Sequence, residues 1–356
     1  MTIHAGRRNR LVATLQERDL AGAFIGNLIN VRYLTGFTGS NGALWLAADG
    51  HAVFLTDGRY KDQAAVEVVG IAHEITRELL GQAAARMQVG RWAVETHTLS
   101  VESYDELVKA APQASIISLE RRVEEMREIK DETEIDALRR ACDISTRALD
   151  GLISGPLLGR SEREIARDLE SRMYALGAEA IAFDTILASG PHSAIPHHSP
   201  SNRLVETGDL LKIDFGARVD GYHADCTRTF TVGKAADWQR EIYAAVQHAQ
   251  AAGLEQLREG VPVADSWKAV TKVLDHAGWL ESFTTGLGHG VGLQIHEDPF
   301  ITARHVGKME PRTVMTMEPG IYLPGRGGVR IEDTVVVTSG APEVLTTMTK
   351  DLLELA

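Results

Sequence analysis

The side chains best suited to chemistry gather in the second half of the sequence, where histidines and carboxylates share short segments. Nine of the 13 histidines lie between His192 and His305. Carboxylates placed close together repel one another unless a cation lies between them. Carboxylate oxygens and imidazole nitrogens are also the ligands of catalytic divalent-ion centres. The candidates for such a centre are Asp214, Asp225, His289, Glu318 and Glu332.

Two of these carboxylates lie on one predicted β-hairpin, in the segment LLKIDFGARVDGYHADCTRTFTV. Its Asp220-Gly221 pair is a strong signal for a type I′ turn. With that turn as the loop, Asp214 faces Thr227 and shares a face of the hairpin with Asp225. Asp225 itself faces Gly216, whose missing side chain leaves space for a cation. The hairpin taken alone favours two solvated aspartates on an edge.

The other candidates come from three later segments. TGLGHGVGLQIHEDPFI surrounds His289 with glycines and continues into a strand-like run, TVMTMEPGIYL is a predicted strand that ends at Glu318, and VRIEDTVVV is a predicted strand that contains Glu332. A glutamate within such an apolar strand is unfavourable unless its charge is neutralised. Four carboxylates and one imidazole suit two divalent ions. Because these ligands are mostly hard oxygens, Mn²⁺ fits best, with Co²⁺ or Zn²⁺ as alternatives.

The surrounding elements divide the chain into two predicted domains, 1–127 and 128–356. The first alternates helices and short strands and includes a hairpin around Asp49-Gly50. The second contains the same order twice: two helices followed by strands. The predicted helices are 131–154, 161–177, 236–258 and 264–277, and the predicted strands lie at 182–189, 209–232, near 284–297 and at 312–338. Ser161 and Glu164 form a capping box at the second helix. This order indicates two similar halves that close around a shared cleft.

Composition narrows the functional classes. The net charge of −12 argues against a nucleic-acid-binding protein, which would present a basic face. No stretch of the sequence approaches the apolar length of a membrane span, and the N-terminus does not resemble a signal peptide. Cys142 and Cys226 have neither metal-site spacing nor a disulfide framework. We therefore expect a cytoplasmic protein.

The candidate segments resemble the pita-bread metallopeptidases, in the branch that contains aminopeptidase P and prolidase. The resemblance runs through FDTILASGPHSAIPHH, KIDFGARVDGYHADCTRTF, GLGHGVGLQIHEDPFI, MTMEPGIY and GVRIEDT, and in the first domain through NVRYLTGFTGSNG and LTDGRY. It covers nearly the whole chain. It implies an α+β chain with a creatinase-type α/β domain at 1–127 and a pita-bread domain with two pseudo-symmetric halves at 128–356.

The resemblance also implies a role for each candidate residue. Asp214 would chelate one metal ion, Asp225 and Glu332 would bridge both, and His289 and Glu318 would hold the other. His197 and His296 match the catalytic-site histidines of the family. Arg330 matches an arginine two residues before the bridging glutamate. His198 stands where the family usually has glycine, so either His197 or His198 could enter the site; we favour His197.

The implied reaction is metal-dependent hydrolysis of the peptide bond between an N-terminal residue and a proline in second position. Glu318 would accept the proton from water, His296 would stabilise the oxyanion, and His197 would orient the residue after the scissile bond. GFTGSNG favours an Xaa-Pro aminopeptidase, and so does Ile301, which stands where some prolidases carry an arginine. An Xaa-Pro dipeptidase and a non-catalytic binding scaffold are the alternatives. The resemblance further implies a homodimer or a higher homo-oligomer.

Overall fold

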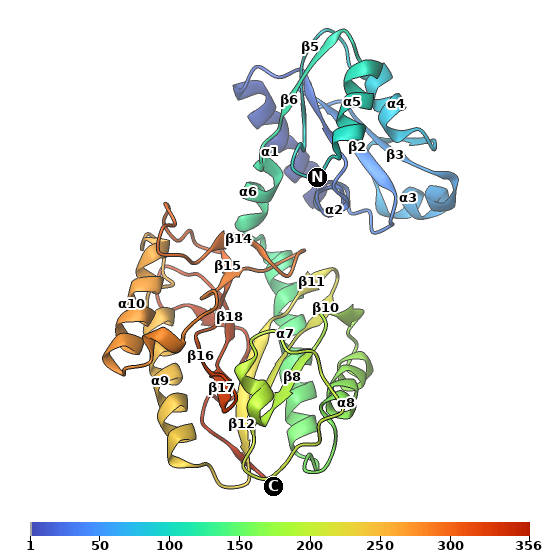
Figure 1. The fold of residues 1–356 in the computed structure, drawn as a ribbon. Coiled ribbons are helices and arrows are strands. Elements are labelled where there is room, and N and C mark those ends of the chain that lie inside the picture. Colours follow the sequence, from blue (N-terminus) through green and yellow to red (C-terminus); the bar gives the residue numbers. More distant parts are fainter. Residues whose placement is uncertain (1) are drawn as a thin grey trace. The chain divides into compact units, whose positions relative to one another are not determined.

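The structure, a computed structural model, describes residues 2–356. The chain divides into two compact units, of which the first ends at Arg127 and the second spans 128–356. Figure 1 shows both units, coloured by sequence. Among the helices of residues 2–356, none is long and apolar enough to cross a membrane.

The first unit is built on a mixed sheet with the strand order β4-β3-β2-β1-β5-β6. Trp45 and Trp92 stack in its core, with ring centroids 5.3 Å apart. The hairpin predicted around Asp49-Gly50 is present, because β2 and β3 pair antiparallel on either side of it. The elements are α1 (Ile3–Glu17), β1 (Gly22–Ile25), α2 (Leu28–Thr35), β2 (Gly42–Ala47), β3 (Ala52–Thr56), α3 (Lys61–Glu67), β4 (Ala72–Ile75), α4 (Leu79–Arg86), β5 (Gly90–Val94), α5 (Val101–Ala110), β6 (Ala114–Ser118) and α6 (Arg122–Glu128).

The second unit repeats one order of elements, as the sequence predicts. The first half contains helices α7 (Glu132–Ile153) and α8 (Glu162–Ala175) and strands β7 (Ala180–Ile181), β8 (Ile186–Ser189), β9 (Leu210–Phe215), β10 (Ala217–Val219), β11 (Tyr222–His223) and β12 (Cys226–Val232). The second contains helices α9 (Asp237–Leu254) and α10 (Val263–His276) and strands β13 (His289–Gly290), β14 (Glu297–Phe300), β15 (Val314–Met317), β16 (Gly320–Leu323), β17 (Gly327–Arg330) and β18 (Asp333–Val336). Two short strands follow, β19 (Glu343–Val344) and β20 (Glu354–Leu355). Within each half the two helices lie side by side, as Figure 1 shows.

Local signals in the sequence set several helix boundaries. The Ser161 side chain accepts a hydrogen bond from the Glu164 N–H, and the Glu164 carboxylate accepts one from the Ser161 N–H, which is the predicted capping box. After α10, Gly278 adopts a φ of 78°, a conformation that glycine tolerates best. The predicted end of helix 236–258 is wrong, because α9 stops at Leu254. The chain after it turns away, and the Glu259 N–H donates to the Thr338 carbonyl oxygen instead.

The two halves of the second unit form separate sheets, and β17 of the second half contacts β9 and β12 of the first. Strands β20-β12-β9-β8 form one sheet, β14-β13-β15-β18-β19 form another, and β16 pairs with β17. A buried apolar cluster packs α9 and α10 against the strands of the second half. It includes Val246, Val270, Met317 and Val335. These helices therefore support, from behind, the strands that carry the candidate site.

Candidate metal centre

The first two candidate ligands lie on the predicted hairpin. Strands β9 and β12 pair antiparallel, and Asp214 faces Thr227, in the predicted register. Asp220 and Gly221 both have positive φ, 50° and 81°, as a type I′ turn requires. The turn residues therefore fix the register that places both aspartates beside the site.

The predicted role of Gly216 is wrong. A Cβ atom at this position would lie 1.8 Å from the carbonyl oxygen of Ala224, so the backbone of the partner strand fills the space reserved for a cation. Gly216 is needed for close approach of the two strands. Asp214 and Asp225 are nevertheless buried, with 7% and 5% of their surface exposed.

The two candidate glutamates follow strand ends. Glu318 comes directly after β15, and its N–H donates to the Leu287 carbonyl oxygen at 2.9 Å. The single strand predicted for VRIEDTVVV is interrupted, since Ile331 and Glu332 lie between β17 and β18. The Glu332 N–H donates instead to the Thr227 carbonyl oxygen, at 3.1 Å. This break ties Glu332 directly to the hairpin strand β12.

The segment around His289 is mostly loop, and of the strand predicted near 284–297 the structure has only β13 and the first residue of β14. Its glycines lie against neighbouring backbone: a Cβ at Gly288 would lie 2.2 Å from the Thr316 carbonyl oxygen, and one at Gly290 would lie 2.2 Å from that of Asp298. Such close packing requires glycine and leaves little room for a regular ladder. His289 Nδ1 lies 3.0 Å from the Gly290 carbonyl oxygen, which points Nε2 toward the carboxylates.

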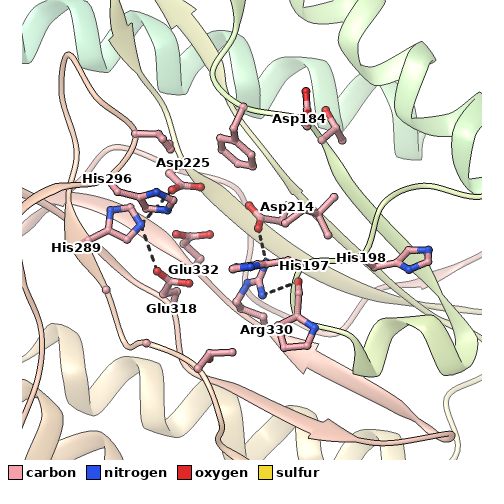
Figure 2. A pocket seen from close by; sticks show the side chains of 18 of the residues that line it. Asp184, His197, His198, Asp214, Asp225, His289, His296, Glu318, Arg330 and Glu332 are labelled. Carbon is pink, nitrogen blue, oxygen red and sulfur yellow. Dashed lines mark hydrogen bonds and ion pairs between the residues drawn. The ribbon is translucent and has the colours of Figure 1, made fainter. Parts of the chain in front are cut away.

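The candidate ligands converge on one region, which Figure 2 shows. His289 Nε2 lies 3.5 Å from Asp225 Oδ2 and 3.4 Å from Glu318 Oε1. Ligand atoms of Asp225, His289 and Glu332 all lie within 4.8 Å of one another, so these three residues could hold a metal ion. Figure 2 also shows Glu318 beside this group and Asp214 on its far side, next to Arg330.

Asp214 has one satisfied and one unsatisfied oxygen. Its Oδ2 pairs with the Arg330 guanidinium, whereas its buried Oδ1 has no hydrogen-bond partner. Arg330 is itself held by Thr227 Oγ1 at 3.0 Å and by Tyr322 Oη at 2.9 Å. An unpaired buried carboxylate oxygen is costly in a folded protein. A cation bound at Oδ1 would remove that cost.

Electrostatics at the site also favour a bound cation. Burial raises the pKa of Asp225 well above its usual range, and the neighbouring carboxylates of Glu332, Asp214 and Glu318 raise it further. Burial likewise raises the pKa of Glu332 and raises that of Glu318 to about 7. Burial lowers the pKa of His289, which favours the neutral imidazole that a metal ion requires. The residues present therefore fit a pair of divalent ions.

A cavity of about 700 Å³ opens over these residues. His197 and His296 both line it, and both residues are partly open to solvent. Burial lowers the pKa of His296, and the neighbouring His289 and His197 lower it further, so the three rings lie close enough to interact. His198 also lines the cavity, but its imidazole is turned away in Figure 2 and its Nε2 lies 2.8 Å from Glu162 Oε2. The geometry favours His197 as the histidine that faces the centre.

Three further residues complete the surroundings, although the sequence did not single them out. Thr227 Oγ1 donates to Glu332 Oε2 at 2.7 Å. Tyr322 lies four residues beyond Glu318 and supports Arg330. Lys212, two residues before Asp214, donates to the Ile195 and Pro196 carbonyl oxygens, which precede His197. Strand alternation places Lys212 on the same face as Asp214. This two-residue spacing is the sequence signal that could have identified Lys212.

Comparison with known proteins gives the family of each unit. The family described as "Metallopeptidase family M24" matches residues 136–339. The chain belongs to metallopeptidase family M24. A second family, described as "Creatinase/Prolidase N-terminal domain", matches residues 7–129 of this M24 protein. The creatinase-type first domain and the pita-bread second domain expected from the sequence are thereby confirmed.

Relatives of this M24 peptidase include Xaa-Pro dipeptidases and an X-Pro aminopeptidase. An Xaa-Pro dipeptidase of Pyrococcus furiosus is 33% identical, over 98% of this chain and 99% of its own. A solved Xaa-Pro dipeptidase from Bacillus anthracis has a TM-score of 0.94 and 35% identity, and the match covers 99% of this chain and 100% of that one. An X-Pro aminopeptidase from Thermotoga maritima has a TM-score of 0.91 and 33% identity, covering 98% and 99%. The chain is thus a metallopeptidase whose relatives include proteins named as Xaa-Pro dipeptidases and as an X-Pro aminopeptidase.

Proposed function

We propose that this protein is an Xaa-Pro dipeptidase, which hydrolyses the bond between a residue and a C-terminal proline. The observation that carries the proposal is the convergence of the five ligand candidates beneath a substrate-sized cavity. Full-length similarity to Xaa-Pro dipeptidases at 33% and 35% identity supports the dipeptide substrate. The sequence alone favoured the Xaa-Pro aminopeptidase, and the Xaa-Pro dipeptidase was its alternative.

The proposed ligands are those predicted from the sequence. Asp214, Asp225, His289, Glu318 and Glu332 would together hold the two ions. When bound, a pair of divalent ions lowers the pKa of water and polarises a carbonyl oxygen. The oxygen-rich ligand set suits Mn²⁺. The unpaired Asp214 Oδ1 and the mutual repulsion of the carboxylates support this assignment.

Side chains of the protein transfer the protons and stabilise the negative charge that develops. Glu318 accepts the proton of the attacking water at a carboxylate oxygen and returns it to the leaving proline nitrogen, and its place on the cavity wall suits both roles. His296, exposed on the cavity wall, donates a ring N–H to the carbonyl oxygen as negative charge develops there. Thr227 holds Glu332 and Arg330 holds Asp214, so two of the proposed ligands are oriented by side chains behind them.

A dipeptide substrate ends in a free carboxylate close to the scissile bond. Among the described residues that line the cavity, the side chains able to carry a positive charge are histidines and Arg330, and Arg330 is committed to Asp214. His197 is therefore our choice for the residue that receives the proline carboxylate. Ile301 is buried in the core and does not line the cavity.

The second candidate is an Xaa-Pro aminopeptidase, which the Thermotoga maritima relative favours. The discriminating experiment compares Ala-Pro with Ala-Pro-Ala on the Mn²⁺-loaded protein at equal concentrations. A dipeptidase hydrolyses Ala-Pro and leaves Ala-Pro-Ala intact. Cleavage of the tripeptide with little cleavage of the dipeptide would replace the proposal by the aminopeptidase. Cleavage of neither by a metal-loaded protein would favour the non-catalytic scaffold.

Two further expectations remain predictions. The first is a homodimer or a higher homo-oligomer, which light scattering of the purified protein tests. The second is a cytoplasmic location, which fractionation of the source cells tests. Both buried cysteines are free thiols, as a reducing compartment would maintain them.

A further inference from the structure

A second cluster of metal-binding side chains lies beside the substrate cavity and shares no residue with the proposed dinuclear centre. Glu162 begins helix α8 and is fully buried. His192 lies on the short 3₁₀ helix Gly190–Ala194, and His198 lies on the loop that follows it. Their rings are adjacent, with centroids 4.3 Å apart and planes inclined by 34°. Three different segments thus bring two imidazoles to one carboxylate.

The geometry of this cluster is close to that of a zinc site. His192 Nδ1 lies 2.9 Å from Glu162 Oε1, and His198 Nε2 lies 2.8 Å from Glu162 Oε2. The three ligand atoms lie within 4.8 Å of one another. Ligands bonded at about 2.0–2.1 Å to a tetrahedral ion lie roughly 3.3 Å apart. Small rotations of the two rings would therefore admit an ion between the nitrogens and the carboxylate.

The carboxylate is held in place by groups that an ion would not displace. Ser189 donates to Glu162 Oε1 from both its N–H and its hydroxyl, and Ser201 donates to Oε2 in the same two ways. Burial would raise the pKa of Glu162, but these hydrogen bonds and the one from His198 outweigh it and lower the pKa to about 2. Glu162 is thus a buried, ionised ligand with an oriented outer shell, as metal-binding carboxylates have.

The open side of the cluster faces solvent. The His192 side chain is 33% exposed and that of His198 is 11% exposed. Two histidines, one glutamate and a water molecule in the fourth position form a recognised zinc coordination set. Imidazole ligands favour Zn²⁺, Ni²⁺ or Cu²⁺ over Mn²⁺, whereas the oxygen-rich dinuclear centre suits Mn²⁺. The two sites therefore differ in metal preference.

We propose that Glu162, His192 and His198 bind a third metal ion, Zn²⁺, beside the substrate cavity. His198 adjoins His197, and its neighbours Ser199 and Pro200 also line the cavity. An ion bound here would fix this loop at one end, while Lys212 and Arg330 hold the Pro196 carbonyl oxygen at the other. The site is independent of the proposed reaction, because it needs neither the dinuclear ligands nor a substrate.

The test is the number of Zn²⁺ ions bound per subunit of the full-length protein at about 1 µM buffered free Zn²⁺, where a site of this kind is filled. The comparison variant carries His192→Asn and His198→Gln. The amide nitrogens of these residues stand near the replaced ring nitrogens and can still donate to Glu162, but amides are poor zinc ligands. We expect the variant to bind one ion fewer than the wild-type protein.

The same comparison in an Asp225→Asn background isolates the cluster from the dinuclear centre. There the expected difference is again one ion, whatever the catalytic activity of the background, so failure of the proposed peptidase function does not affect this result. His248→Asn is the matched control, because His248 is exposed on α9.

Equal zinc counts with and without the two substitutions would overturn the proposal and leave a hydrogen-bonded triad without metal affinity. An equal loss of zinc in His248→Asn would overturn it too, because zinc would then be bound by surface histidines in general. Co²⁺ gives a second readout that does not depend on the variant's stability. We expect the wild-type protein loaded with Mn²⁺ to develop a four-coordinate Co²⁺ absorption band, and its absence would contradict the proposal.

Discussion

At the scale of single residues, the centre is a set of carboxylates that destabilise one another until a cation neutralises them. Burial raises the pKa values of Asp225 and Glu332, and each carboxylate adds to the effect on its neighbours. Such groups are seldom kept in a buried position for stability alone. Bound divalent ions offset the free-energy cost of burying these carboxylates. Removal of any one ligand should therefore lower the metal affinity.

Replacing Asp225 by Asn removes one proposed bridging ligand with almost no change in volume. We expect loss of bound metal and a fall in kcat/KM of about 10³-fold, since the ions contribute several kcal/mol to the transition state and 1.36 kcal/mol corresponds to a factor of ten. Metal analysis and Ala-Pro hydrolysis measure the two effects. Asp220→Asn, in the exposed hairpin turn, is the control and should keep both metal and activity. Full activity in Asp225→Asn would refute the bridging role.

Thr227 provides a test of the groups behind the ligands. Its hydroxyl donates to Glu332 and accepts from the Arg330 side chain. Thr227→Val removes both bonds at constant shape, so we expect metal affinity to fall about 10–100-fold, measured by calorimetric titration. Thr229→Val is the matched control on the same strand, because Thr229 bonds only the Arg330 backbone. Equal affinities in the two variants would show that Thr227 does not orient Glu332.

At the scale of elements, the hairpin of β9–β12 was predictable because its turn is encoded in two adjacent residues. Asp220-Gly221 sets the register, and the register places Asp214 opposite Thr227. What the sequence could not supply was the interruption of this ladder at Gly216 and of the later strand at Ile331–Glu332. Both depend on contacts from distant segments, the Ala224 backbone in one case and the Thr227 carbonyl oxygen in the other.

The hairpin should not tolerate a side chain at Gly216. In Gly216→Ala the new Cβ would overlap the Ala224 carbonyl oxygen, so the strands must separate. We expect a loss of roughly 1–3 kcal/mol in the free energy of unfolding, together with weaker metal binding. Denaturant unfolding and metal analysis measure these changes. Gly58→Ala adds the same methyl group where no atom lies within 4 Å and should be nearly neutral. A wild-type stability in Gly216→Ala would mean that the strands relax freely there.

At the scale of the whole molecule, the sequence predicted two domains and the repeat within the second, because long periodic helices and their caps carry strong local signals. For the first unit the sequence predicted alternating helices and short strands but did not locate α2, α4 or α5. Short helices such as α2 are fixed by tertiary contacts; there the Gly26 and Asn27 N–H groups at its start donate to Glu95, far along the chain.

Glu95 gives the first unit a pH dependence of its own. Burial raises its pKa to about 7, although Asn30 and the backbone of Asn27 and Gly26 oppose the shift. Because the folded pKa exceeds the unfolded value, its contribution is most favourable below about pH 4.5 and declines as the pH rises to 7, by on the order of 3 kcal/mol. Hydrogen exchange of the β1 and β5 amides, corrected for intrinsic rates, should therefore quicken over this range. Glu95→Gln should remove the dependence, and an unchanged profile in it would exclude Glu95 as the cause.

Hydrolysis of an Xaa-Pro dipeptide by this protein should depend on metal ions held by these five side chains. The most direct test is the rate of Ala-Pro hydrolysis after the protein is stripped with a chelator and then titrated with Mn²⁺. We predict no activity in the stripped protein and full recovery at about two ions per subunit. Full activity in a protein shown to be free of metal would show that hydrolysis does not depend on bound metal ions.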